Sequence, residues 1–224
     1  RAPRVRPARD EKVLASWNGL MLRAMAEGAR AFDDDALRAA AVAAGEFLRR
    51  EMVRDGRVFR TWRNGVAKLQ GYLEDHAAVA LGFVALYQLT FDRVWLDEAL
   101  ALARQTVASF WSDEAVAFFD TAHDAEPLVT RPRDVTDNAI PSGTALAVEL
   151  QLIAAEYAGD PQMRRRAEYV LATLGAPLRR SPLSFGHLLG AADVAVHGAR
   201  QVAIGGEVRS EACRRAPQIY PHPV

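Results

Sequence analysis

Apolar residues recur along the chain with the period of an α-helix, and this pattern occurs three times. Three segments share an Asp that is followed seven residues later by an Ala: Ala31–Leu48, Thr90–Val107 and Ala158–Leu174. The aligned residues Asp33, Asp92 and Asp160 are placed to cap the helix that follows each of them. The sequence therefore predicts three helices that begin just after these positions.

A second helical run precedes each of these Asp residues, at roughly 16–31, 72–90 and 142–158. These preceding helices carry few charges, and in the second one only Glu74 and Asp75 are charged. The helices after each Asp carry more charges and keep a single apolar stripe. A helix that is apolar all round is buried, whereas an amphipathic one is half exposed. We therefore expect an inner ring of helices wrapped by an outer ring, which is an all-α fold: a partial α/α toroid over residues 1–200.

The connections divide into short and long ones. The turns from inner to outer helices are short, whereas the links at 55–71 and 112–141 are long and lead to the start of an inner helix. The first long link alternates polar and apolar residues around Asn64-Gly65, which predicts a small β-hairpin. Long loops in compact domains are often functional, so we expect a site at the end of the ring where both links arrive.

The polar start of the second inner helix is the first candidate for chemistry. Glu74, Asp75 and His76 stand together there, ahead of a helix that carries no further charge. The positive end of the helix dipole is enough to explain carboxylates at this place, and we weigh this structural interpretation above the catalytic one. They also suit acid/base work in a cavity. Successive residues diverge by about 100° on a helix, so only one of Glu74 and Asp75 is expected to face the cavity.

The other candidates come from the starts of the inner helices and from the long links. Asp120, His123 and Asp124 are metal-ligand types, but their spacing matches no strong motif, and we expect no metal and no cofactor. The expected catalytic residues are Glu74, Asp75 and Asp137. The expected ligand-binding residues are Trp17, Asn18, Trp62, Arg63, Tyr72, His76, Arg131, Asn138 and Ser142.

Composition narrows the function classes. The 28 Lys and Arg residues balance the 28 Asp and Glu residues, which argues against general binding to nucleic acid or to an anionic membrane. The single cysteine, Cys213, allows no internal disulfide and fits a cytoplasmic protein. No apolar run is long enough to favour a membrane span. Residues 201–224 predict a short strand, "QVAIGGE", followed by a Pro-rich tail.

Several stretches together resemble a known family. They are "DEKVLASWNGLMLRAMAEGAR", "GYLEDHAAVALGFVALYQLTFDRVWLDEAL", "FFDTAHDAEPLVTRPRDVTDNAIPSG" and "VAIGGE". They resemble the thioredoxin-domain-containing proteins of the spermatogenesis-associated protein 20 type. The resemblance implies a thioredoxin-like domain elsewhere in a parent chain and a toroid similar to those of N-acylglucosamine 2-epimerases and six-hairpin glycosidases. His76 and Thr144 depart from the family pattern, which usually has an aromatic residue and an Asn there.

Three functional hypotheses stay open at this level. The toroid binds or acts on a carbohydrate-type ligand in its central cavity by carboxylate acid/base chemistry, as a sugar isomerase, epimerase or glycoside hydrolase would. Alternatively, it is a non-catalytic scaffold that binds a ligand or partner beside a redox domain. In the third, the polar residues at the end of the ring only pair with one another and hold the long loops.

Overall fold

The computed structural model describes residues 8–199, so the strand and tail predicted for 201–224 lie outside the described residues. The predicted hairpins are present, and a further helix follows them. The helices are α1 (Ala15–Phe32), α2 (Asp35–Phe47), α3 (Leu73–Thr90), α4 (Arg93–Phe110), α5 (Gly143–Ala158), α6 (Pro161–Arg180) and α7 (Gly186–His197). A single π-helical turn, Leu48–Met52, extends α2, and a 3-10 turn, Pro182–Phe185, leads into α7.

The helix caps follow the predicted pattern with one correction. Asp92 and Asp160 cap α4 and α6 by accepting hydrogen bonds from backbone N–H groups of the first turn. In the first hairpin the cap of α2 is Asp34, which accepts from the Leu37 N–H at 2.9 Å. Asp33 instead ends α1 in a left-handed conformation, with a φ of 51°. All three turns have the same length, because in each one a left-handed residue (Asp33, Phe91 or Gly159) ends the inner helix and the next residue caps the outer one. The sequence alignment was therefore one position early in the first hairpin, where the left-handed residue is itself an Asp.

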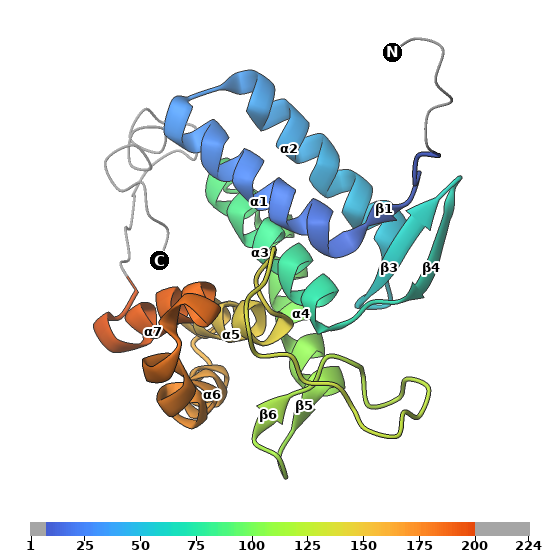
Figure 1. Ribbon diagram of the computed structural model, residues 1–224. Helices are drawn as coiled ribbons and strands as arrows, with labels where there is room; N and C mark the ends of the chain where they lie inside the picture. Colours follow the sequence, from blue (N-terminus) through green and yellow to red (C-terminus); the bar gives the residue numbers. More distant parts are fainter. Residues whose placement is uncertain (1–7, 200–224) are drawn as a thin grey trace, which may run out of the picture.

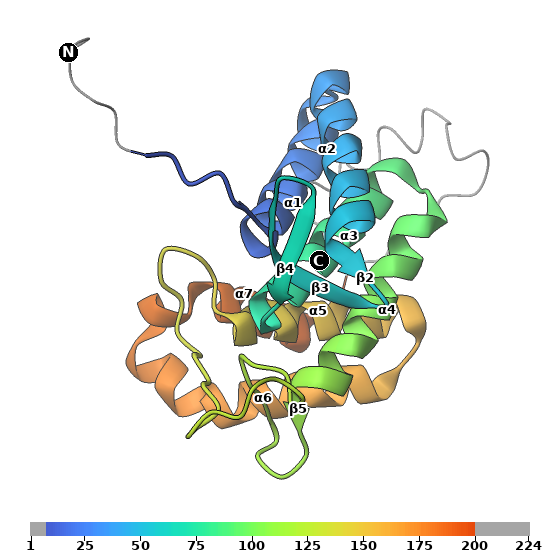
Figure 2. The ribbon, with the colours of Figure 1, turned by 90° about the vertical axis from the view of Figure 1, so that its right-hand side faces the viewer.

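The helices form an arc with two layers (Figures 1 and 2). The inner layer runs α1, α3, α5 and α7, each in contact with the next, while α2, α4 and α6 pack on the outside. Helix α3 is the most buried element, with apolar side chains enclosed on every face. The prediction that the uncharged helix lies inside is therefore confirmed, and burial of this apolar surface is the main stabilising contribution in the core.

Two inner helices differ from the sequence expectation. Helix α1 is buried on one face only, and Trp17 and Met21 on its other face are 61% and 58% exposed. Among the described residues it has an inner neighbour on one side, α3, so its second side is uncovered. Helix α7, where the sequence suggested a less organised region, is a regular fourth inner helix that buries Leu188 and Ala191 against its neighbours.

The first long link forms the predicted hairpin. Strand β3 (Arg57–Arg63) pairs antiparallel with β4 (Val66–Gln70), and Asn64 and Gly65 make the turn with φ values of 51° and 79°. The short strands β1 (Val13–Leu14) and β2 (Val53–Arg54) pair with β3 on its other edge. In the second long link, β5 (Trp111–Ser112) pairs with β6 (Ala117–Phe118), and the chain then crosses the front of the molecule to α5 (Figure 1).

Candidate functional site

The inner helices begin at one end of the arc, and two carboxylates connect their first turns. Asp75, in the first turn of α3, accepts a hydrogen bond from the Ser16 N–H at the start of α1. Asp137, in the long loop, accepts from the Ser142 N–H with one oxygen and from the His187 N–H with the other, at 2.9 and 2.7 Å. Asp75 therefore ties the starts of α1 and α3 together, and Asp137 ties the starts of α5 and α7 together.

Asp75 is a core residue. It is fully buried, and its two oxygens accept from the N–H groups of Ser16 and Tyr72 and from Arg60 Nη1. A buried carboxylate with this many donors is stabilised in place and has no oxygen directed at a ligand. The structure thus places Asp75, one of the expected catalytic residues, in the core, where it positions the first turns of α1 and α3.

Glu74 faces outward from the same turn. Its Oε1 accepts from Arg60 Nη1 at 2.8 Å, and its side chain stays 26% exposed. The Arg60 guanidinium also stacks over the Tyr72 ring, 4.5 Å from its centre. The expectation that one member of the Glu74-Asp75 pair faces a cavity is met in the structure by Glu74.

Glu74 lines a pocket of about 390 Å³ beside the starts of α3 and α5, here called the mouth pocket. Asp120 and Asp134 bring further carboxylates into it, and Ser142 brings a hydroxyl that already accepts from the Ala145 N–H. The expected ligand residues Tyr72, Asn138 and Ser142 are all part of its lining. The remaining lining residues are Thr121, Leu128, Pro132, Thr136, Ile140, Pro141 and Gly143.

Asp120 is a functional candidate that the sequence interpretation considered only as a metal ligand. Its Oδ2 accepts from the Asp134 N–H, and its backbone carbonyl accepts from the Leu73 N–H at the start of α3. Burial raises the pKa of the Asp120 carboxyl, and the neighbouring charges of Asp134 and Glu74 raise it further, against the opposing effect of the Asp134 backbone bond. No sequence motif marks this residue, since only the fold of the loop brings it beside Glu74.

His76 lies in the core and not in the mouth pocket. Its Nε2 accepts from the Val58 N–H, its Nδ1 contacts the Tyr72 carbonyl oxygen, and its ring packs edge-on against Phe110 at 5.0 Å. Burial lowers the pKa of His76 to about 4, so the ring is neutral at pH 7.

The other expected residues lie outside the lining of the mouth pocket. Trp17 and Arg63 are exposed, and Asn18 donates to the Leu14 carbonyl. Trp62 packs edge-on against Phe47 at 5.2 Å. Arg131 stacks over Phe119 and donates to the Thr121 carbonyl, and so braces the loop that forms one pocket wall. Asp137, expected to be catalytic, uses both oxygens to hold helix starts, as described above.

A second group of polar residues lies on the inner helices and was missed from the sequence. Arg23 of α1, Glu149 of α5 and His187 of α7 meet beside another pocket, of about 470 Å³, here called the inner pocket. The available signal was Glu149 itself, because it is one of two charged residues in the otherwise apolar α5, and the other, Glu156, lies near the helix end. The sequence interpretation took His187 as a packing or surface residue, whereas it contacts Glu149 at 2.8 Å.

Within residues 8–199, no group of three or more His, Cys, Asp and Glu side chains is arranged to hold a metal ion. None of the helices in that range combines the length and the apolar character needed to cross a membrane.

No protein-family model matches the chain. Spermatogenesis-associated protein 20 of Homo sapiens is 28% identical over 218 residues, covering 92% of this chain and 28% of that protein. The Mus musculus protein of the same name is 27% identical over 213 residues, covering 90% of this chain and 27% of its own length. The chain thus spans little more than a quarter of the length of the curated relatives that it matches.

Solved structures show the same helix arrangement. Cellobiose 2-epimerase from Bacillus thermoamylovorans B4167 aligns with a TM-score of 0.61 at 14% identity, covering 75% of this chain and 45% of that one. D-Mannose isomerase aligns with a TM-score of 0.54 at 11% identity, covering 73% and 43%. The chain is therefore a relative of spermatogenesis-associated protein 20 whose described residues form part of a six-hairpin α/α toroid, as its motifs and its helix pattern predicted.

Proposed function

We propose that the mouth pocket binds a carbohydrate-type ligand, and that Glu74 and Asp120 are the carboxylates that act on it. The observation that carries this proposal is the contrast between these two side chains in one pocket. Glu74 is paired with Arg60, whereas Asp120 is half-buried, forms no ion pair within residues 8–199, and has a pKa raised by burial. Two carboxyl groups in unlike environments are the arrangement that acid/base enzymes use.

The roles follow from these environments. Asp120, whose pKa is raised, is the group that holds a proton more readily and serves as the acid. Glu74, beside the Arg60 guanidinium, is the carboxylate that accepts a proton or stabilises positive charge on the ligand. Asp75 and Asp137 support the site from behind by fixing the helix starts.

The rest of the lining suits a neutral ligand rich in hydroxyl groups. Asn138, Ser142 and Thr136 offer amide and hydroxyl groups, and Tyr72 offers an aromatic ring beside them. Pockets of this kind fix a ligand by a few placed polar groups on an otherwise apolar wall. A sugar epimerase and a sugar isomerase share this fold, and they support a carbohydrate ligand by analogy alone.

Calorimetric titration with cellobiose and with D-mannose tests the proposal, with product analysis by chromatography on the same samples. We expect binding that weakens by about tenfold or more in Glu74→Gln and Asp120→Asn, since each loses a charged hydrogen-bonding group. Asp124→Asn is the matched control, because Asp124 lies in the same long loop but pairs with Arg57 away from the pocket. Equal affinity in all three variants would contradict a ligand site at Glu74 and Asp120.

The alternative is a non-catalytic binding scaffold beside the thioredoxin-like domain that the family resemblance implies. One observation favours it: both carboxylates already have partners, Arg60 for Glu74 and the Asp134 N–H for Asp120. Binding of a sugar that depends on Asn138 and Tyr72, with no product formed at any pH, would favour the scaffold over the enzyme. The cytoplasmic location and the attached redox domain belong to the same proposal.

A further inference from the structure

The three outer helices occupy equivalent places in the repeat, yet one of them carries charge of nearly a single sign. Helix α2 has one Arg beside two acidic residues, and α4 has two Arg beside two acidic residues. Helix α6 has five Arg and one Glu, in a chain whose 28 basic and 28 acidic residues balance. The excess of positive charge on α6 is therefore a local feature that the helical repeat does not require.

Within residues 8–199, one of the five α6 arginines has a carboxylate partner. Arg164 pairs with Glu156 and Glu168, at 3.1 and 2.9 Å. The guanidinium of Arg166 lies over the Trp111 ring, 6.0 Å from its centre, and forms no ion pair in the described part of the chain. The other three are exposed and likewise pair with no carboxylate of that part: Arg165, Arg179 and Arg180.

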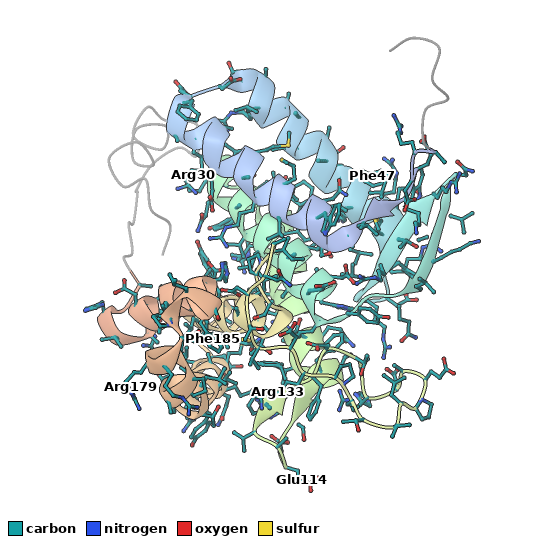
Figure 3. The ribbon with its side chains drawn as sticks, in the orientation of Figure 1. Arg30, Phe47, Glu114, Arg133, Arg179 and Phe185 are labelled. Carbon is teal, nitrogen blue, oxygen red and sulfur yellow. The ribbon has the colours of Figure 1, made fainter. Side chains whose placement is uncertain are left out.

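The unpaired arginines share the solvent side of α6 with an exposed aromatic ring. This surface, here called the basic face, consists of Arg165, Arg166, Tyr169, Arg179 and Arg180. At about 100° per residue, these side chains leave the helix within an arc of about 140°, opposite the buried stripe that packs on α5. Tyr169 is 56% exposed, and Arg179, which Figure 3 labels, lies at the outer edge of the molecule. No residue of the basic face lines the mouth pocket or the inner pocket.

The basic face has two charged ends and a neutral centre. Arg165 and Arg179 are 14 positions apart in the helix, a separation of about 20 Å along its axis. This exceeds the Debye length of about 8 Å at physiological salt, so each arginine pair attracts its own counter-charge. The exposed residues between the two pairs carry no charge: Tyr169, Ala172, Thr173 and Ala176. A partner whose negative charge is gathered at two separate points therefore matches the face.

The helix dipole accounts for one of the two arginine pairs. Cations are favoured at the C-terminal end of a helix, where Arg179 and Arg180 form the last residues of α6. Arg165 and Arg166 lie near the opposite, positive end, and the first turn of α6 contains no acidic residue to offset them. The dipole therefore gives no stability to this second pair, and its placement points to an anionic group outside the helix.

We propose that the basic face is a docking surface for an acidic protein segment with carboxylates at two points about 20 Å apart. Guanidinium groups bind carboxylates through paired hydrogen bonds, and Tyr and Arg are enriched where protein interfaces gain most of their binding energy. A partner helix with Glu or Asp residues about four turns apart reaches both arginine pairs, and its uncharged middle lies over Tyr169.

Two observations favour a protein over a nucleic acid or an anionic lipid surface. Both of these present negative charge continuously, whereas the centre of the basic face has no cation to meet it. The balanced charge of the whole chain also supplies no general attraction to either of them. A protein segment can instead place its few carboxylates only where the arginines lie.

Fluorescence anisotropy with a designed peptide tests the proposal. The probe is a labelled helical peptide of about 20 residues, built from Ala and Gln, with two Glu near each end on one face, about four turns apart. We expect binding that weakens by about tenfold when salt rises from about 50 mM to about 300 mM, because exposed charges are screened. The same peptide with its Glu residues replaced by Gln is the reference probe and should not bind.

Two double variants each remove one end of the basic face: Arg165→Gln with Arg166→Gln, and Arg179→Gln with Arg180→Gln. Each should weaken binding of the acidic peptide by about fivefold to tenfold, since two exposed ion pairs are lost. The matched control is Arg93→Gln with Arg104→Gln, which removes the same charge from exposed positions of α4 and should bind the peptide as the wild type does. Circular dichroism spectra and unfolding curves show that the variants are folded.

Three results would overturn the inference. One is no salt-dependent binding of the acidic peptide, and another is a loss of affinity in the α4 control equal to that in the α6 variants. The third is tighter binding of a single-stranded oligothymidylate, or of phosphatidylserine vesicles, through the same arginines, which would assign the basic face to a nucleic acid or a membrane. Sugar binding at the mouth pocket should be unchanged in the α6 variants, so the inference stands or falls separately from the proposed function.

Discussion

One nitrogen of Arg60 bonds both Glu74 and Asp75, at 2.8 and 3.1 Å, yet the two carboxylates lie in different environments. Glu74 lines the mouth pocket, whereas Asp75 is fully buried and holds the start of α1. The difference arises because neighbouring residues on a helix point about 100° apart. A single cation therefore links a carboxylate that lines the mouth pocket to a carboxylate in the core.

Replacing Asp75 by Asn should lower the free energy of unfolding by about 3 kcal/mol. The carboxylate accepts from three donors, whereas Asn has one acceptor oxygen and would direct an NH2 group at another donor. Urea unfolding followed by circular dichroism measures the change. Glu74→Gln is the matched control and should change stability by less than about 1 kcal/mol, because Glu74 is a partly exposed ion pair. Equal losses in both variants would contradict the assigned roles.

Gly19 sets the distance between α1 and α3. A Cβ built on Gly19 would lie 2.6 Å from the Ala78 carbonyl carbon, which is a backbone atom that cannot move aside. Gly19→Ala should therefore force the helices apart and destabilise the fold by about 1–3 kcal/mol. Gly28→Ala on the same helix meets only a side-chain methyl at 3.6 Å, so it should be neutral or stabilising by up to about 1 kcal/mol. Thermal unfolding of the pair measures both, and a Gly19→Ala protein as stable as Gly28→Ala would refute the close packing.

His76 should make stability depend on pH between about 6.5 and 4. Its pKa is lowered from 6.5 to about 4 because the buried ring resists protonation, so in this range the unfolded chain binds more protons than the folded one. Its contribution is complete above pH 6.5 and decreases by roughly 3 kcal/mol as the pH falls to 4. The free energy of unfolding, measured with urea at several pH values in this range, should change less steeply with pH in His76→Phe. This variant keeps an aromatic ring against Phe110. A slope that is unchanged in the variant would show that His76 does not titrate this way.

Asp137→Asn should loosen the starts of α5 and α7 together. Its two oxygens accept from the N–H groups of Ser142 and His187, and Asn retains only one acceptor. Amide hydrogen exchange should become faster at these two positions, mainly at the amide that loses its acceptor. The increase should correspond to a loss of roughly 1–3 kcal/mol in local stability. Amides in the middle of α3 serve as the internal reference and should keep their protection. Unchanged protection at both Ser142 and His187 would contradict the clamp.

The periodic part of the structure follows from sequence alone. The inner and outer helices, the Asp92 and Asp160 caps and the Asn64-Gly65 turn all depend on residues close together in the chain. Apolar period and capping chemistry are local, so they predict these elements. The same pattern predicted that α3 is buried. Beyond its first turn this helix carries no charge, so it has no polar face that could be exposed to solvent.

The tertiary structure decided which polar groups meet. Arg60, and not Arg63, pairs with Glu74, because the β3 register turns alternate side chains to opposite faces. Arg23 and Glu149 are 126 positions apart in the chain and bond only because α1 and α5 lie on the same inner face. Asp120 and His187 became candidates in the same way, and α7 was recognised as an inner helix only through its contact with α5. Local propensity describes each helix, whereas the contacts between helices depend on how all of them pack around one core, and it is those contacts that build both pockets.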